Sequence, residues 1–173
     1  MDALILAFWR ILLLRAAPQS VSASPGLLWL SLLLHYGIGL LHALFSLPFA
    51  VAVSYALLST LIMVAVVHGL LLLFRKHARY MQTLTALAAC EALLGVMLLP
   101  LSVLYYLSGG GEELRGLLAI LSLLVVGWNM ALAAHIFKHA LSVSTGLGFL
   151  YSIAYLLIAI TLGDMVSAAG VTQ

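Results

Sequence analysis

The chain has 173 residues, of which 65% are hydrophobic and only 7% are charged. A soluble domain carries about a quarter charged residues, so this composition excludes a soluble globular protein and indicates a membrane protein. The net charge of +2 is too small to indicate a nucleic-acid partner. Cys90 is the single cysteine, which excludes an internal disulfide and a thiolate metal cage.

The N-terminal segment is apolar but too short to cross a bilayer, which takes about 20 residues. Asp2 and Arg10 also break the pattern of a secretory signal peptide. Arg10 and Arg15 can reach from an apolar helix to the headgroups, as long basic side chains do at a membrane surface. We therefore predict an interfacial helix over residues 3–15.

A long apolar stretch follows and carries no Asp, Glu, Lys or Arg before Arg75. Ser24 followed by Pro25 predicts the start of a helix, because serine caps a helix and proline suits its first position. Ser46 and Pro48 repeat this signal in the middle of the stretch. The stretch is therefore predicted to cross the membrane twice, as a hairpin.

The rest of the chain is divided by polar loops, of which the glycine-rich turn at 108–113 is the clearest. Backbone polar groups in lipid must be bonded internally, so the apolar stretches are predicted to be helices. The expected fold is an all-α, polytopic integral membrane bundle, forming one domain over residues 1–173. Its five transmembrane helices are expected at about 27–47, 49–74, 81–107, 114–137 and 143–162.

The basic residues predict the orientation of the bundle. With a cytoplasmic N-terminus, six of the seven Lys and Arg residues fall inside and only Arg115 falls outside. The C-terminus is then expected in a periplasm or an organelle lumen. The two inner loops supply candidate contacts for anionic lipid headgroups, which are Arg75, Lys76, Arg79 and Lys138. The simpler alternative is that these residues only fix the topology.

Glu91 is the most informative polar residue within the predicted spans. Ionisable groups inside a membrane are costly and mark candidate functional sites. Its helix face also carries the small residues Ala88, Ala92 and Gly95, which predicts that it points into the bundle. Asn129 and His35 are expected at a similar depth. The site is either a proton relay or substrate site, or a neutral Glu91 that holds neighbouring helices in register.

The first predicted span carries a stripe of small and polar residues at helical spacing. Its members are Ser31, His35, Gly39, His42 and Ser46. Such a stripe either lines a polar path or cofactor site, or packs against a partner helix through small and hydrogen-bonding side chains. His42 therefore joins the candidates for the polar site, although no histidine is expected at its depth in another span.

Histidine pairs at matching depths on two helices can hold haem b, and the candidate ligands are His35, His68 and His135. No CxxCH motif is present, which excludes covalent haem. Packing and interfacial histidines are commoner than ligands, so we expect no cofactor and no metal. The sequence also lacks a Walker loop, an HExxH motif and a GxSxG motif, so no catalytic residue and no enzymatic activity are predicted.

Three stretches carry a resemblance to a known family. They are Phe8–Arg15 followed by Pro18, Ser24 and Pro25, then Tyr80–Leu87, and later Leu99–Pro100. On these residues most of the chain resembles small bacterial inner-membrane proteins similar to the Ypt/Rab-interacting (Yip) family. The resemblance implies five spans, a cytoplasmic N-terminus, the bacterial inner membrane and a non-enzymatic adaptor or assembly factor. The acidic-aromatic signature of the eukaryotic members is absent, so Rab binding is not implied and no family site residue is carried over.

Three functions follow as hypotheses. The first is an adaptor, assembly factor or accessory subunit that contacts a membrane-protein partner or a second copy within the lipid bilayer. The small-residue faces that favour such contacts are Ala88/Ala92/Gly95 and Gly127/Ala131. The first alternative is a small proton-coupled transporter with a polar site centred on Glu91. The second alternative is an electron-transfer subunit that binds haem b or quinone.

Overall fold

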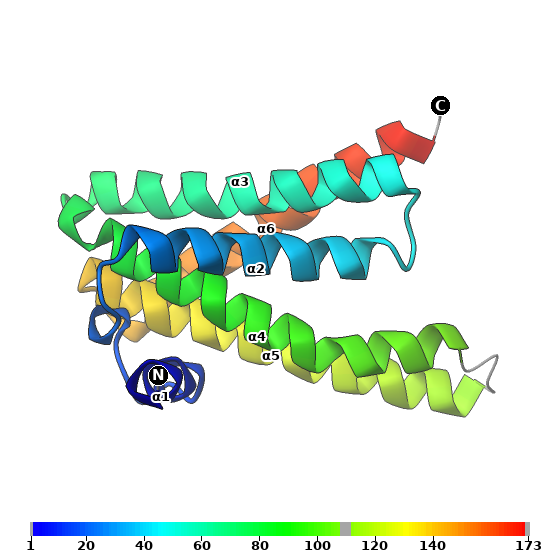
Figure 1. The fold of residues 1–173 in the computed structure, drawn as a ribbon, viewed down its shortest axis with the longest axis horizontal. Coiled ribbons are helices and arrows are strands. Elements are labelled where there is room, and N and C mark those ends of the chain that lie inside the picture. The colour runs from blue at the N-terminus through cyan, green and yellow to red at the C-terminus, as the bar shows by residue number, and fades with distance from the viewer. Residues whose placement is uncertain (1, 108–111, 172–173) are drawn as a thin grey trace.

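The computed structural model describes residues 2–107 and 112–171, and these residues form helices and turns with no strand. Figure 1 shows the helices side by side in one elongated bundle. The α-helices are α1 (Asp2–Leu12), α2 (Pro25–Ala43), α3 (Phe49–Leu73), α4 (Tyr80–Leu107), α5 (Glu112–Leu141) and α6 (Thr145–Val171). Two short 3-10 helices, η1 (Pro18–Ser20) and η2 (His77–Arg79), lie in the connections.

Five of these helices, α2 to α6, are long and apolar enough to cross a membrane. This confirms the predicted all-α membrane bundle with five transmembrane helices. The short N-terminal helix is also present, as α1 with 11 residues. The predicted glycine-rich turn begins on residues 108–111, which lie outside the described residues.

The bounds of α2 show how local sequence signals set its length. Ser24 caps the helix by accepting a hydrogen bond from a backbone N–H, and Pro25 occupies the first turn as predicted. The helix ends at Ala43, four residues before the predicted end, and residues 44–48 form a turn. The residue before Pro48 is restricted to extended backbone angles, so the helix stops before the proline.

α1 runs across the bundle rather than along it, and Figure 1 shows this helix end-on. Hydrogen bonds from α5 hold the segment in which α1 ends. Trp128 Nε1 donates to the carbonyl oxygen of Leu12 at 3.0 Å, and His135 Nε2 lies 2.9 Å from the carbonyl oxygen of Ala16. Ile11 is fully buried, whereas Trp9 is 52% exposed. One face of α1 is therefore buried against the bundle, while its location at a membrane surface stays a prediction.

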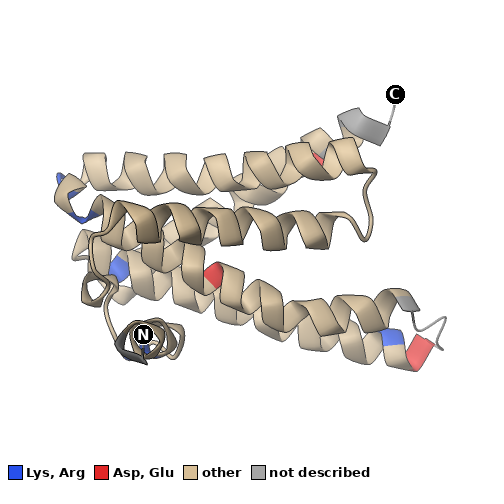
Figure 2. Ribbon diagram, in the orientation of Figure 1, with Lys and Arg blue, Asp and Glu red and all other residues tan. Residues whose placement is uncertain are grey.

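The bundle has two chemically different ends. One end, here the basic end, carries Arg75, Lys76, Arg79 and Lys138. The other, here the acidic end, holds the turn at 44–48, the start of α5 with Glu112 and Glu113, and the last third of α6 with Asp164. Figure 2 shows most of the blue segments at the basic end, one blue segment beside the red start of α5 at the acidic end, and one red segment midway along the bundle.

Packing also differs between the two halves of the bundle. In the half at the basic end, every residue of α4 from Thr83 to Cys90 is buried, and so are most residues of α5 from Leu132 to Leu141. In the half at the acidic end, Leu118 is the one buried residue that α5 has between positions 112 and 131. Figure 1 shows α4 and α5 diverging from α2 and α3 toward the acidic end.

Candidate intramembrane polar site

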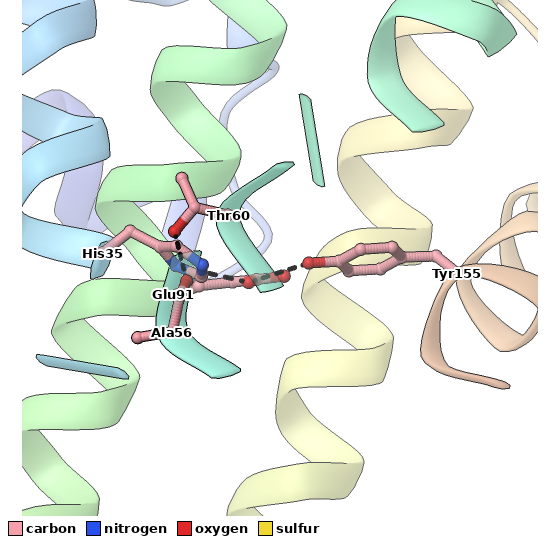
Figure 3. Close-up of polar contacts among 5 residues, drawn as sticks. All are labelled: His35, Ala56, Thr60, Glu91 and Tyr155. Atoms are coloured by element: carbon pink, nitrogen blue, oxygen red, sulfur yellow. Dashed lines mark hydrogen bonds and ion pairs between the residues drawn. The ribbon is translucent and has the colours of Figure 1, made fainter. Parts of the chain in front are cut away.

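Glu91 lies at the centre of a polar cluster inside the bundle, as Figure 3 shows. Its Oε2 accepts a hydrogen bond from the Tyr155 hydroxyl at 3.2 Å and lies 3.7 Å from Nδ1 of His35. The side chains of Glu91 and His35 are only 8% and 12% exposed. Helices α2, α4 and α6 therefore meet at one carboxyl group.

A cavity of about 160 Å³ adjoins this carboxyl group. Its walls include all four residues that the sequence assigns to the polar site, which are His35, His42, Glu91 and Asn129. Oε1 of Glu91 and Oδ1 of Asn129 are buried and have no hydrogen-bond partner. A buried acceptor without a partner costs about 1–3 kcal/mol, so both oxygens favour a hydrogen-bond donor in the cavity.

His42 lines this cavity near the end of α2. Its Nε2 lies 2.9 Å from the carbonyl oxygen of Gly95, and its Nδ1 lies 3.3 Å from Oγ of Ser102. Both partners belong to α4, so the imidazole joins α2 to α4. A Cβ atom added at Gly95 would lie 2.5 Å from Cγ2 of Ile38, so glycine permits this close approach of the two helices.

Four of the five residues of the predicted polar stripe lie on α2 and face the bundle, whereas Ser46 is exposed in the turn after the helix. The Ser31 hydroxyl is buried and donates to a backbone carbonyl one turn earlier. His35 reaches Glu91, while Gly39 and His42 line the cavity beside it. The stripe therefore packs against α4 and also lines a cavity, so it combines features of the two alternatives given by the sequence.

The three candidate haem ligands have different neighbours. His35 contacts the Glu91 carboxyl, and His68 packs edge-on against the ring of Tyr80 with centroids 5.4 Å apart. His135 meets a backbone carbonyl of the segment after α1. Within the described ranges, no group of three or more His, Cys, Asp or Glu side chains is placed to hold a metal ion.

The basic residues of the inner loops divide into two groups. Arg79 Nη1 donates to the carbonyl oxygens of His139 and Ala140 at 3.0 Å each and to Oγ of Ser142 at 2.8 Å. This guanidinium therefore caps the end of α5 and interacts favourably with the helix dipole. The other three candidates for lipid headgroups, Arg75, Lys76 and Lys138, are exposed or partly exposed.

The two small-residue faces also have different surroundings. Ala88 and Ala92 are buried, and Gly95 contacts α2, so this face is used for packing within the chain. Gly127 is exposed, and a Cβ added there would meet nothing within 4 Å. Only the face of Gly127 remains open to another chain.

Tyr155 is the site residue that the sequence does not single out. It contributes the one hydrogen bond that the Glu91 carboxyl makes in the structure. The ring of Tyr155 also packs edge-on against Phe137 of α5, with centroids 6.3 Å apart, which fixes its position. The hydroxyl thus orients the carboxyl group toward the cavity.

No family model, curated protein or solved structure matches this chain. The resemblance to the Yip family therefore stays a prediction that rests on the residues quoted for it.

Proposed function

We propose that this protein is a small proton-coupled membrane transporter in which Glu91 binds and releases the coupled proton. The supporting observation is the environment of the Glu91 carboxyl. One oxygen is hydrogen-bonded to Tyr155, the other is buried without a partner, and Glu91 lines a cavity. Carboxyl and imidazole groups placed together inside a membrane are typical of proton relays in transporters.

Glu91 and His35 can share one proton in two ways, and the pair has no net charge in either state. With the proton on Glu91, the carboxyl and His35 are both neutral, which avoids a lone charge in a low-dielectric region. With the proton on His35, the two groups form an ion pair at 3.7 Å. Transfer of the proton within this pair leaves no isolated charge, and its release to the cavity leaves a Glu91 carboxylate that accepts a hydrogen bond from Tyr155. Asn129 Oδ1 supplies an acceptor for a solute or water that carries donors.

The direct test is a pH jump applied to proteoliposomes on a solid-supported membrane. Proton binding to a buried carboxyl moves charge within the protein, so we expect a transient current with the wild type even without the transported solute. Glu91→Gln should abolish this current because the amide cannot titrate. Glu112→Gln is the matched control, since Glu112 is exposed at the start of α5. An unchanged current in Glu91→Gln would contradict the proposal.

A second candidate function is an adaptor that binds a membrane-protein partner or a second copy. The exposed face of Gly127 and Ala131 supports it, because small residues let another helix approach closely. Five spans are few for a carrier, so a second copy also suits a transporter.

Mass spectrometry after purification in mild detergent tests this face. We expect a dimer or a stoichiometric partner that Gly127→Leu removes, with Gly69→Leu as the control because Gly69 is also exposed and open. A strictly monomeric particle with no bound protein argues against the adaptor function.

We also propose that the basic end faces the cytoplasm, in a bacterial inner membrane. The support is the gathering of basic residues at one end of the bundle. A phosphatase reporter fused at Gln173 or after Gly110 should be active. The same reporter fused after His77 or Leu141 should be silent, and activity after His77 would overturn this orientation.

A further inference from the structure

The cavity beside Glu91 is continued by a second one. A cavity of about 360 Å³ lies between α2, α3 and α6, and Gly39 and His42 line both cavities. Gly39 and His42 therefore stand at the boundary between the two cavities.

The second cavity leads toward the acidic end and has polar walls. Ser46 belongs to the turn after α2, Tyr55 to the second turn of α3, and Asp164 to the last third of α6. A Cβ added at Gly163 would lie 2.7 Å from Cε2 of Tyr55, so α3 and α6 are in close contact beside this cavity. The walls thus combine a carboxyl group, a phenol and a serine hydroxyl.

The basic-end half packs closely around α4 on the other side of Glu91. The segment Thr83–Cys90 of α4 is buried throughout. Ile11 of α1 and Phe137 of α5 are 0% and 1% exposed and belong to the same core. A cavity of about 260 Å³ in this half is lined by Tyr155, but its walls are mostly apolar, so it is a poorer site for water.

We infer that water reaches Glu91 from the acidic end through the two cavities, and that His42 is the gate between them. Each cavity exceeds the roughly 30 Å³ that one water occupies, and each has several polar wall residues to bind water. The ring of His42 is held at the junction by Gly95 and Ser102. The role of this route as a proton path rests on the proposed function, whereas the route itself is a property of the structure.

Cysteine labelling can test the route in membrane vesicles of known orientation. The background is Cys90→Ala, because Cys90 is the single native cysteine. Single cysteines then replace Ser46, Gly39 and Ala92, which follow the route from the acidic end to the cavity of Glu91. The probe is a small charged methanethiosulfonate that does not cross the bilayer.

Two positions serve as controls. Leu41 lies two residues from Gly39 and is 49% exposed on the outside of the bundle. Leu41→Cys therefore tests whether the probe labels a lipid-facing position at the same depth. Thr85 is fully buried in the basic-end half, so Thr85→Cys reports the closed side. We expect labelling of the Ser46→Cys and Gly39→Cys variants from the acidic-end face only and no labelling of either control. Failure to label Gly39→Cys, or equal labelling from the basic-end face, would overturn the inference.

The gate is tested with Ala92→Cys as the reporter of the inner cavity. His42→Ala should increase its labelling rate because the ring leaves the junction, and His42→Phe should abolish labelling because the passage stays blocked. His42→Gln is a second variant, which keeps hydrogen-bonding groups at the junction and should retain the wild-type rate. Equal rates in the alanine, phenylalanine and wild-type forms would overturn the assignment of His42.

The two proposals can fail separately. If the pH-jump current depends on Glu91 but the Gly39→Cys variant is not labelled, the proposed route is wrong and the role of Glu91 as the proton site still holds. Labelling along the route with an unchanged current in Glu91→Gln would support the route and contradict the proton-coupled function.

Discussion

The half of the bundle at the basic end differs from the half at the acidic end in packing and in polarity. The basic-end half buries a continuous segment of α4, and α1 and the cap made by Arg79 add contacts there. The acidic-end half contains two cavities with both polar and apolar wall residues, and it has few buried residues on α5. Glu91 lies at the boundary between the halves. The difference indicates that the first half supplies stability and the second supplies access to Glu91.

The strongest test of this contrast is the same substitution in each half. A Cβ added at Gly148 would lie 2.5 Å from the carbonyl oxygen of Ala134, so Gly148→Leu should force α6 away from α5 and cost about 3 kcal/mol. Gly39 lines both cavities, so Gly39→Leu should change the free energy of unfolding by no more than about 1 kcal/mol. Denaturant unfolding in detergent measures both values. Equal losses of unfolding free energy in the two variants would show that the two halves are packed equally tightly.

The two ends can be compared through their arginines. Arg79→Ala removes three hydrogen bonds at the end of α5 and should cost about 2 kcal/mol of unfolding free energy. Arg115 is exposed at the acidic end, so Arg115→Ala is the control and should be nearly neutral. A loss of equal size in both variants would show that charge, rather than capping, is responsible.

The anchoring of α1 can be tested with Trp128→Phe. This substitution keeps an aromatic ring but removes the N–H that donates to Leu12, so we expect a loss of about 1 kcal/mol. The loss should appear as faster hydrogen exchange in α1 and as no change near the cavities. Trp29→Phe, at a position that is 66% exposed, is the control. Unchanged exchange in α1 would argue against this anchor.

The smallest expected effect concerns the hydroxyl of Thr85. This group is buried without a partner in the basic-end half, so Thr85→Val should be neutral or stabilise the protein by up to about 1 kcal/mol. The Thr60 hydroxyl donates to the carbonyl oxygen of Ala56 at 2.9 Å, so Thr60→Val should not stabilise. A clear loss of stability in Thr85→Val would indicate that its hydroxyl has a partner after all.

The sequence predicts the helices well because each has a strong local cause. A long apolar run makes a membrane helix, and the Ser24–Pro25 and Pro48 signals set the start of α2 and the turn after it. The meeting of His35, Glu91 and Asn129 follows from their depth, since helices cross the membrane at a fixed rise per residue.

The partner of Glu91 could not be predicted because depth does not tell which helices are neighbours. Tyr155 lies ten residues after the start of α6, and Glu91 lies eleven residues after the start of α4, so their depths match. Whether α6 turns this face toward α4 depends on packing among all five helices. The hydrogen bonds of Arg79 and His135 are equally non-local, since both bind carbonyl groups far away in the sequence.

The central claim is that the Glu91 carboxyl exchanges its proton with water from the acidic end. Infrared difference spectroscopy of the reconstituted protein tests it most directly, because a protonated carboxyl has its own C=O stretching band. We predict a band that changes with pH, shifts in heavy water and is absent in Glu91→Gln but present in Glu112→Gln. A band that neither changes with pH nor shifts in heavy water, or one that persists in Glu91→Gln, would contradict the account.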